Sequence, residues 1–356
     1  MFRNFTNLEE LSLVDVNINS VLPASLNISS SLKSLSLLAT GLQGKLPHYI
    51  FNLHSLEKLE LSLNMLTGDI PSFITDNQTH LTYLGLSDNS LNGTLPSWLF
   101  TSPSLEHISL GGNMFSGNVP FDQTFRKLTN LTALTLSSNN FSGEWELDTF
   151  LTNNRNLETL YLSYSGFSVT TKNANHYVNP GFRQLTLASC KLKVFPNSFR
   201  AMKQLKVLDL SSNEIHGQIP HWAGEIGGDY GLVSLNLSHN FITGLPQFQW
   251  YGLEYLELQS NLIEGPFPPS ICNMSNLWYL DMSNNRFGGL IPQCFGKLTS
   301  SLEMIDMGNN SFQGSIPSSY NDCGPLECTE FGLEEEEEKT CLHREMTLDN
   351  ESVALE

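Results

Sequence analysis

Apolar residues return at a fixed spacing along most of the chain. Residues 56–71, LEKLELSLNMLTGDIP, show the repeated unit most clearly and reduce to LxxLxLxxNxLxGxIP. Thirteen copies, spaced 21 to 27 residues apart, begin at Leu8, Leu32, Leu56, Leu81, Leu105, Leu131, Leu157, Phe182, Leu205, Leu232, Leu253, Leu277 and Leu302. A unit of this length cannot bury its apolar face alone, so stacked neighbours must cover it. The pattern therefore predicts a solenoid.

The two halves of each unit predict different local structure. In LxxLxL the apolar positions alternate at a period of two, which is typical of a short strand with one face inward. Of the 16 prolines, 11 follow the glycine-containing turn, where a fixed φ and a missing backbone donor are tolerated. We predict an α/β solenoid over residues 1–319, a curved right-handed superhelix. Its parallel sheet would line the concave side, with short helical or 3-10 segments and turns on the convex side.

The asparagine of the unit predicts a structural ladder inside the turns. A buried carboxamide can both donate to and accept from backbone groups that water does not reach. Nine copies carry this residue, at Asn64, Asn89, Asn113, Asn139, Asn213, Asn240, Asn261, Asn285 and Asn310. The other four copies have Val16, Thr40, Ser165 and Cys190 at this position. Because valine offers the turn no hydrogen bond, the first copy should be the weakest.

The complete unit resembles the plant-specific class of extracellular leucine-rich repeats. That class is found in receptor-like kinases and receptor-like proteins, and the resemblance covers about nine-tenths of the chain. Longer strings resemble the receptor-like proteins in particular. These are LTLASCKLKVFP at 185–196, LDLSSNEIHGQIPHW at 208–222, LNLSHNFITGL at 235–245 and PPSICNMSNLWYLDMSNN at 268–285.

The resemblance implies a non-catalytic recognition module on the extracellular side of the plasma membrane. Such proteins bind a peptide, protein or wall-derived elicitor in plant defence or development and signal through a partner receptor kinase. Two alternatives remain open at this point. One is a soluble inhibitor of a secreted cell-wall hydrolase, similar to polygalacturonase-inhibiting proteins. The other is a truncated product without activity of its own.

Charge and the chain ends refine this expectation. The chain has 18 basic and 36 acidic residues, a formal charge of −18, which argues against nucleic acid or an anionic membrane as a partner. Residues 320–356 carry −10 of this charge. With five consecutive glutamates at Glu334–Glu338, they read as a disordered tail or an acidic docking segment.

Neither end of the chain matches a complete receptor-like protein. No run of 18 apolar residues suggests a spanning helix, and no signal segment or cysteine-bearing cap precedes the first copy. We therefore expect a fragment of a larger ectodomain or a truncated product, prone to fraying or aggregation. Apolar residues should be exposed at its two ends, namely Leu11, Leu13, Ile18, Ile305, Met307 and Phe312.

A ligand would contact the residues between the structural leucines. These residues point out of the concave face, and stacked copies bring equivalent ones about 4.8 Å apart. One such column is polar and mostly acidic, with Asp209, Asn236, Glu257, Asp281 and Asp306. Aromatic residues beside it, which are typical anchors of protein interfaces, are Tyr255, Trp278 and Tyr279, with Tyr161 and Tyr164 from an earlier copy. Aspartate is also common in this column of such repeats, so a purely structural role stays open.

The remaining chemistry is sparse. P-loop, HExxH, GxSxG and kinase motifs are absent, so we expect no enzyme, no cofactor and no metal. Cys190 is expected to be a buried thiol. Cys272 and Cys294, about one copy apart on the convex side, are expected to form a disulfide if their Cα atoms come within about 7 Å. N-glycosylation signals on the helical or convex side point to Asn27, Asn77 and Asn273.

Overall fold

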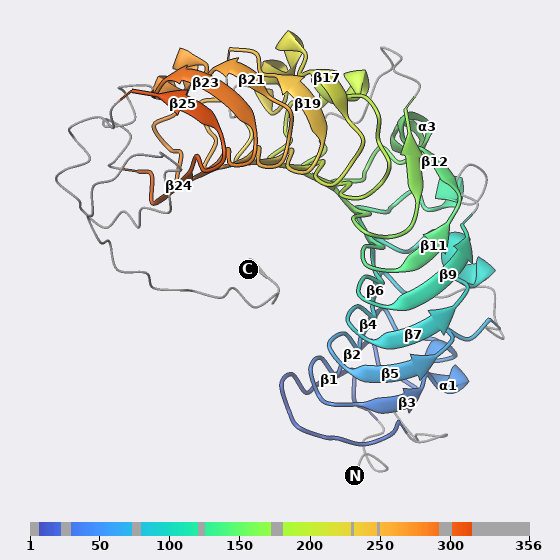
Figure 1. Ribbon diagram of the computed structural model, residues 1–356. Coiled ribbons are helices and arrows are strands. Elements are labelled where there is room, and N and C mark those ends of the chain that lie inside the picture. The colour runs from blue at the N-terminus through green and yellow to red at the C-terminus, as the bar shows by residue number, and fades with distance from the viewer. Residues whose placement is uncertain are drawn as a thin grey trace.

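The chain forms a curved solenoid. This computed structural model describes residues 7–22, 30–72, 80–119, 125–171, 181–228, 231–247, 250–291 and 301–314. Thirteen parallel strands line the inside of the arc (Figure 1). They are β1 (Glu10–Ser12), β2 (Ser34–Ser36), β4 (Lys58–Glu60), β6 (Tyr83–Gly85), β8 (His107–Ser109), β10 (Ala133–Thr135), β13 (Thr159–Tyr161), β15 (Gln184–Thr186), β16 (Val207–Asp209), β18 (Ser234–Asn236), β20 (Tyr255–Glu257), β22 (Tyr279–Asp281) and β24 (Met304–Asp306). We number the coils 1 to 13 by these strands.

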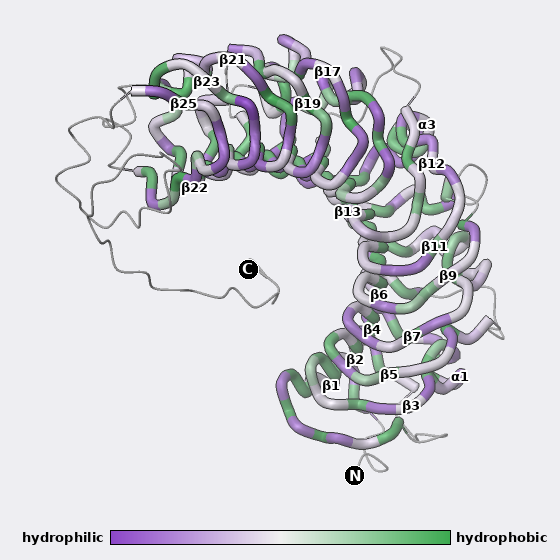
Figure 2. The backbone as a smooth tube through the Cα atoms, in the orientation of Figure 1, coloured by the Kyte–Doolittle hydropathy of each residue, from purple (hydrophilic) through white to green (hydrophobic). Residues whose placement is uncertain are grey.

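The period of two in LxxLxL produces this sheet. The middle residue of every strand points into the core and is buried in all coils except the first, where Leu11 is partly exposed. The strands pair in register, so that Leu59 lies beside Leu84 and Leu256 beside Leu280. Figure 2 shows hydrophobic residues recurring at the same place in coil after coil. The predicted fold class and the parallel concave sheet are confirmed.

A second set of strands, which the sequence pattern did not predict, runs along one flank of the arc (Figure 1). We call these the lateral strands; they come from the residues that follow the ladder position. One sheet joins five of them and three smaller sheets join the others. They are β3 (Gln43–Lys45), β5 (Met65–Gly68), β7 (Ser90–Gly93), β9 (Met114–Asn118), β11 (Asn140–Ser142), β12 (Glu144–Glu146), β14 (Ser168–Thr170), β17 (His216–Gln218), β19 (Phe241–Gly244), β21 (Glu264–Pro266), β23 (Arg286–Leu290) and β25 (Ser311–Gln313).

Short helices close the coils on the convex side. They are α1 (His48–Phe51), η1 (Ser97–Phe100), η2 (Phe125–Lys127), α3 (Leu147–Asn153), η3 (Asn197–Ala201), η4 (His221–Glu225) and η6 (Pro269–Asn273). In five of them the residue before the helix is the turn proline, with φ between −59° and −78°. Its fixed φ suits this position, and its missing donor leaves no hydrogen bond unmade. None of the described helices has the length and apolar character needed to cross a membrane.

Each ladder asparagine ties its coil to the preceding one. The Asn213 Oδ1 accepts from the backbone N–H groups of Cys190 and Leu192, at 3.0 and 2.9 Å. Its Nδ2 donates to the carbonyls of Leu187, Leu210 and Ser211. Every hydrogen-bonding group of the carboxamide is therefore used. Four of the nine amides are buried, and the other five are half-buried rather than closed to water.

Coils without the asparagine follow a different backbone path through the turn. In every coil the residue before the ladder position has a left-handed φ. In coils 2, 7 and 8 the residue after the ladder position also has a left-handed φ; these residues are Gly41, Gly166 and Lys191. In coil 7 the Ser165 carbonyl accepts from the Phe141 N–H at 2.9 Å, a contact that the amide oxygen makes elsewhere. The backbone makes this contact in place of the missing amide. The first residues after the ladder position therefore do not join a lateral strand.

Lys191 is the strained member of this group. Its φ is +59°, a conformation that costs a residue with a Cβ about 1–2 kcal/mol but costs glycine little. We expect Lys191→Gly to raise the free energy of unfolding by about 0.5–1 kcal/mol, after the added entropy of glycine in the unfolded chain is subtracted. Urea denaturation should show this gain. Lys193→Gly is the control, because Lys193 is not left-handed; a gain of the same size there would contradict the explanation.

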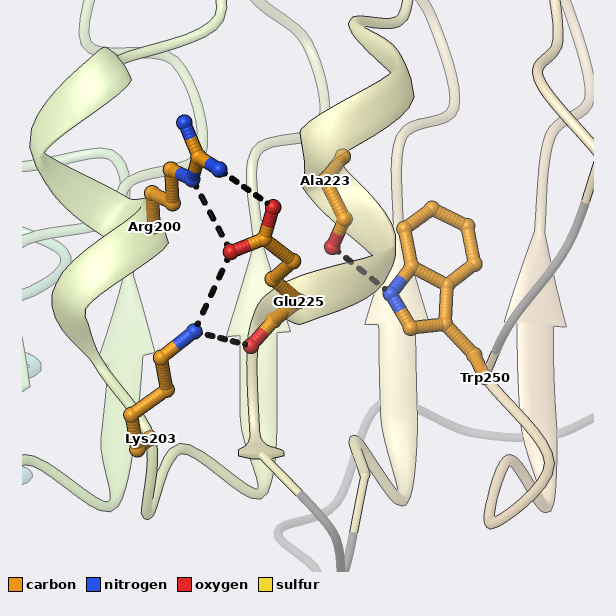
Figure 3. A network of polar contacts seen from close by, with 5 residues as sticks. All are labelled: Arg200, Lys203, Ala223, Glu225 and Trp250. Atoms are coloured by element: carbon orange, nitrogen blue, oxygen red, sulfur yellow. Dashed lines mark hydrogen bonds and ion pairs between the residues drawn. The ribbon is translucent and has the colours of Figure 1, made fainter.

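Polar contacts also join the convex segments of coils 8 to 10. Arg200 and Lys203 both contact Glu225, with a 2.6 Å contact from Arg200 Nη2 to Glu225 Oε1 and 3.5 Å from Lys203 Nζ to Oε2 (Figure 3). The indole of Trp250 donates to the Ala223 carbonyl at 2.9 Å. Trp250 is 1% exposed, so it combines a large apolar contact area with a satisfied donor.

Exposure at the two ends differs from the expectation. Leu11, Leu13, Ile18 and Phe312 are partly exposed, but Ile305 and Met307 are buried, at 4% and 6% exposure. The alternation along β24 turns the latter two side chains into the interior of their own coil. There they join the hydrophobic core that includes Leu280 and Met282 of coil 12.

Candidate ligand-binding surface

The concave strands bring the predicted polar column together in register. Asp209 pairs with Asn236, Asn236 with Glu257, Glu257 with Asp281, and Asp281 with Asp306. Neighbouring members are thus about one strand spacing, 4.8 Å, apart. We call these five residues the acidic column.

In four members of the acidic column, Asp209, Asn236, Asp281 and Asp306, part of the polar group serves the fold. An Oδ1 atom accepts the backbone N–H two residues further on, from Ser211 to Asp209 at 2.9 Å and from Ser283 to Asp281 at 3.0 Å. Asn236 makes the same contact with Ser238 at 2.9 Å. This explains why aspartate is common here, and it shows that an amide satisfies the same backbone donor. The second carboxylate oxygen is not needed for this contact.

The carboxylates of the column are held close together, and the charge of His239 lowers the pKa of Asp281 only as the last of several causes. Burial raises the pKa of Asp209 and Asp281, and it raises that of Glu257 with help from the charges of Asp209 and Asp281. Among the described residues no lysine or arginine forms an ion pair with any of them. The column is therefore a site where a cation from outside would be stabilised.

The raised pKa values predict how stability depends on pH. A carboxyl whose folded-state pKa is raised contributes stability that is present at low pH and is lost as pH rises through that pKa. We expect the triple variant Asp209→Asn, Glu257→Gln and Asp281→Asn to have a higher urea midpoint than the wild type at pH 7. The difference should narrow as the pH is lowered towards 4. A difference that does not change with pH would contradict the assignment.

Three aromatic side chains lie beside the acidic column in coils 11 and 12. Tyr255 contacts Trp278 edge to face, with ring centroids 5.2 Å apart, and stacks with Tyr279 at 6.4 Å. Tyr255 and Trp278 are each 37% exposed, which is high for large apolar rings. Burial and the charges of Asp281 and Glu257 raise the pKa of Tyr279 to about 12, so its phenol stays neutral. We call these three residues the aromatic cluster.

The other predicted tyrosines belong to a separate region. Tyr161 and Tyr164 are in coil 7, four coils from Tyr255, which at 4.8 Å per strand is roughly 20 Å. The Tyr161 hydroxyl donates to the Gln184 side chain in the next coil. Tyr164 is 55% exposed, and its hydroxyl lies 3.3 Å from Ser212 Oγ, two coils away. The five aromatic residues therefore do not form one surface.

A similar group, not predicted from the sequence, lies in coils 3 and 4. Tyr83 donates to Glu60 Oε2 at 2.7 Å, and Lys58 Nζ lies 5.0 Å above its ring. The signal was available, because Glu60 occupies the same column as Asp209. Here, however, the protein supplies its own cation and its own hydrogen bond. This contrast distinguishes the group from the aromatic cluster, where no described hydrogen bond joins a tyrosine to the acidic column and no described lysine or arginine lies over a ring.

Several other expected sites can be placed only in part. Cys272 is disulfide-bonded, and Cys294, its expected partner, lies outside the described residues. Asn273 is exposed at the end of η6 on the convex side, while Asn27, Asn77 and residues 315–356 lie outside the described residues. Cys190 is buried and free, and burial raises the pKa of its thiol to about 12, so it is present as the neutral thiol.

Sequence comparison relates the chain to repeat-containing receptors. Leucine-rich repeat family models match residues 79–141, 204–225, 231–287 and 301–323. Receptor-like protein 32 of Arabidopsis thaliana is 34% identical over 145 residues, and Receptor-like protein 53 of the same plant is 36% identical over 124. These alignments cover 38% and 34% of this chain but only 16% and 13% of the relatives. The chain thus corresponds to a small part of their length.

Solved structures agree with the sequence relatives. The receptor kinase HAESA of Arabidopsis, in complex with the peptide hormone IDA and the co-receptor SERK1, aligns with a TM-score of 0.79 and 29% identity. That alignment covers 91% of this chain and 54% of the HAESA chain. A TDR receptor aligns with a TM-score of 0.72 and 28% identity, over 90% of this chain and 59% of that one.

Proposed function

We propose, from the premise that the chain belongs to the leucine-rich repeat receptor-like proteins of plants, that it recognises a peptide on its concave face. The ligand would lie along coils 9 to 13, across the acidic column and the aromatic cluster. The module would be extracellular and non-catalytic, with signalling left to a partner receptor kinase. The observation that carries this proposal is the pair of exposed rings, Tyr255 and Trp278, beside carboxylates that form no ion pair with a lysine or arginine among the described residues.

The chemistry of the surface favours a peptide with a basic side chain. An arginine or lysine placed over Tyr255 or Trp278 would gain a cation–π contact, and Glu257 and Asp281 could accept its N–H groups. Because these carboxylates are partly desolvated and repel one another, a cation also relieves a cost that the free protein carries. Rigid aromatic rings supply the contact area typical of binding hot spots.

The solved relatives support a peptide ligand and a kinase partner in general terms. HAESA is seen with a peptide hormone and a co-receptor, and PEPR1 with AtPEP1. Those ectodomains share the solenoid geometry of this chain. The identity of its own ligand depends on the residues between the leucines, which differ from coil to coil.

Selection of short random peptides on the full chain tests the proposal. We expect enrichment of peptides with arginine or lysine, and an affinity loss of about tenfold or more for the double variant Tyr255→Ala and Trp278→Ala, as for other aromatic hot spots. The matched control is Phe241→Ala with Leu290→Ala, which removes exposed apolar side chains from the lateral strands. Equal losses in the two variants would overturn the assignment of the surface.

A further inference from the structure

The lateral sheets are interrupted at coil 8. β14 in coil 7 pairs only with β12, and β17 in coil 9 pairs only with β19. Between them coil 8 contributes β15 to the concave sheet but no lateral strand among its described residues. The left-handed Lys191 stands where most asparagine-containing coils begin this strand.

Backbone contacts across the interruption are incomplete. Val169 donates to the Cys190 carbonyl at 2.8 Å, and on the other side Glu214 and His216 donate to the carbonyls of Leu192 and Lys193. Beyond Val169, no described backbone hydrogen bond joins β14 to coil 8. An exposed strand edge with free donors and acceptors is a template for another strand.

A groove of about 340 Å³ lies at this place. Its walls are Ser168 to Thr171 along β14 and Lys191 to Val194 of coil 8, and Glu144 and Glu214 also line it. Val169 and Leu192 are buried beneath it, while Val194 is 40% exposed. The volume is at the lower end of the range in which proteins hold small ligands or short peptide segments.

The charge of coil 8 and the start of coil 9 is unusual for this protein. Residues 183–206 hold six of the 18 basic residues and no acidic one, in a chain with a formal charge of −18. Four of the six are engaged: Arg183 with Glu158, Arg200 and Lys203 with Glu225, and Lys206 with the Gly231 carbonyl.

Lys191 and Lys193 are the two remaining cations. Both are exposed, and no described residue forms an ion pair or a side-chain hydrogen bond with either ammonium group. They point to a ligand that carries a carboxylate. Glu144 and Glu214 would repel a continuous acidic run, so one carboxylate between neutral residues suits the lining better than a block such as Glu334–Glu338.

We propose that this groove binds an extended segment of a partner protein with one aspartate or glutamate between β-branched or neutral residues. The segment adds as a strand to the open edge of β14, where main-chain hydrogen bonds hold it. Its carboxylate pairs with Lys191 and Lys193, and a neighbouring apolar side chain covers Val194. The groove lies on the flank of the arc and is separate from the concave face.

In the test, a display library of short random peptides is first selected for binding to the full chain. The retained peptides are then sorted for those that no longer bind the double variant Lys191→Gln and Lys193→Gln. We expect the sorted peptides to carry a single acidic residue and to lose about tenfold or more in affinity on that variant, as expected for a ligand whose one carboxylate loses both cations. The double variant Lys45→Gln and Lys127→Gln removes the same charge elsewhere and should leave affinity unchanged. Equal urea midpoints of the two variants establish that both are folded.

Two further readouts test strand addition itself. Bound peptide should slow hydrogen exchange at Thr171, since the Val169 N–H is already bonded to the Cys190 carbonyl, and methylation of alternate backbone nitrogens of the peptide should abolish binding. The proposal is overturned if no peptide distinguishes the wild type from the Lys191 and Lys193 variant. It is equally overturned if the sorted peptides leave exchange at Thr171 unchanged, or if the methylated peptides bind as well as the originals.

Discussion

Replacing Trp250 with alanine is expected to lower the free energy of unfolding by about 4 kcal/mol, since truncation of a fully buried aromatic side chain typically costs about 3–5 kcal/mol. Trp250 is 1% exposed, and its indole N–H satisfies the Ala223 carbonyl at 2.9 Å. The substitution therefore opens a cavity between coils 9 and 10 and removes one of the two donors of the Ala223 carbonyl, which keeps the Ile226 N–H at 3.1 Å. In a solenoid each coil is stabilised by its neighbours, so the loss should spread to adjacent coils.

The adjacent Tyr251 provides the control for this prediction. It is also aromatic but is 54% exposed, so Tyr251→Ala should cost less than about 1 kcal/mol. Urea denaturation followed by circular dichroism measures both variants. Similar losses for Trp250→Ala and Tyr251→Ala would show that the buried contact is not what stabilises this region.

Replacing the ladder residue Asn213 with alanine should cost about 3 kcal/mol. The carboxamide serves two backbone donors and three carbonyls, in coils 8 and 9. A buried polar group left without a partner costs about 1–3 kcal/mol, and water entering the turn would recover part of the sum. The Leu210 carbonyl keeps a second donor, Asn240 Nδ2 at 2.9 Å, but coil 8 has no amide of its own, because Cys190 occupies its ladder position.

Two comparisons make the Asn213 prediction specific. Asn276→Ala removes an exposed carboxamide outside the ladder and should change the free energy of unfolding by less than about 0.5 kcal/mol. Hydrogen exchange should accelerate at the amides of Cys190 and Leu192, which lose their acceptor. Unchanged exchange at these two amides would contradict the role assigned to Asn213.

The concave sheet and the turns at the prolines could be predicted from the repeat pattern, because each depends on residues within one unit. Strand alternation and the fixed φ of proline are local properties, so they can be read directly from LxxLxL and from residues such as Pro196 and Pro268. The lateral strands could not be predicted in this way. They depend on the backbone that follows the ladder residue, and its path changes with that residue, as Lys191 and Gly166 show.

The sequence predicted which residues share a column of the concave face, but not which of these side chains group into a site. Strand register placed Glu257 beside Asp281, and the repeat spacing alone implied this. The sequence could not show that Asp281 also accepts a backbone N–H, or that Lys58 and Glu60 already satisfy Tyr83. Those contacts depend on side-chain conformations across neighbouring coils. They distinguish carboxylates whose oxygens are used by contacts within the fold from carboxylates that still have an oxygen able to accept a hydrogen bond from a ligand.

Hydrogen exchange of the full chain, with and without the selected basic peptide, tests the central claim most directly. Peptide binding along the concave face should slow exchange in Tyr255–Glu257 and Tyr279–Asp281. The same peptide should leave the lateral strand Phe241–Gly244 and the convex helix His221–Glu225 unchanged. Protection confined to the lateral or convex segments, with none in the two concave strands, would contradict the account.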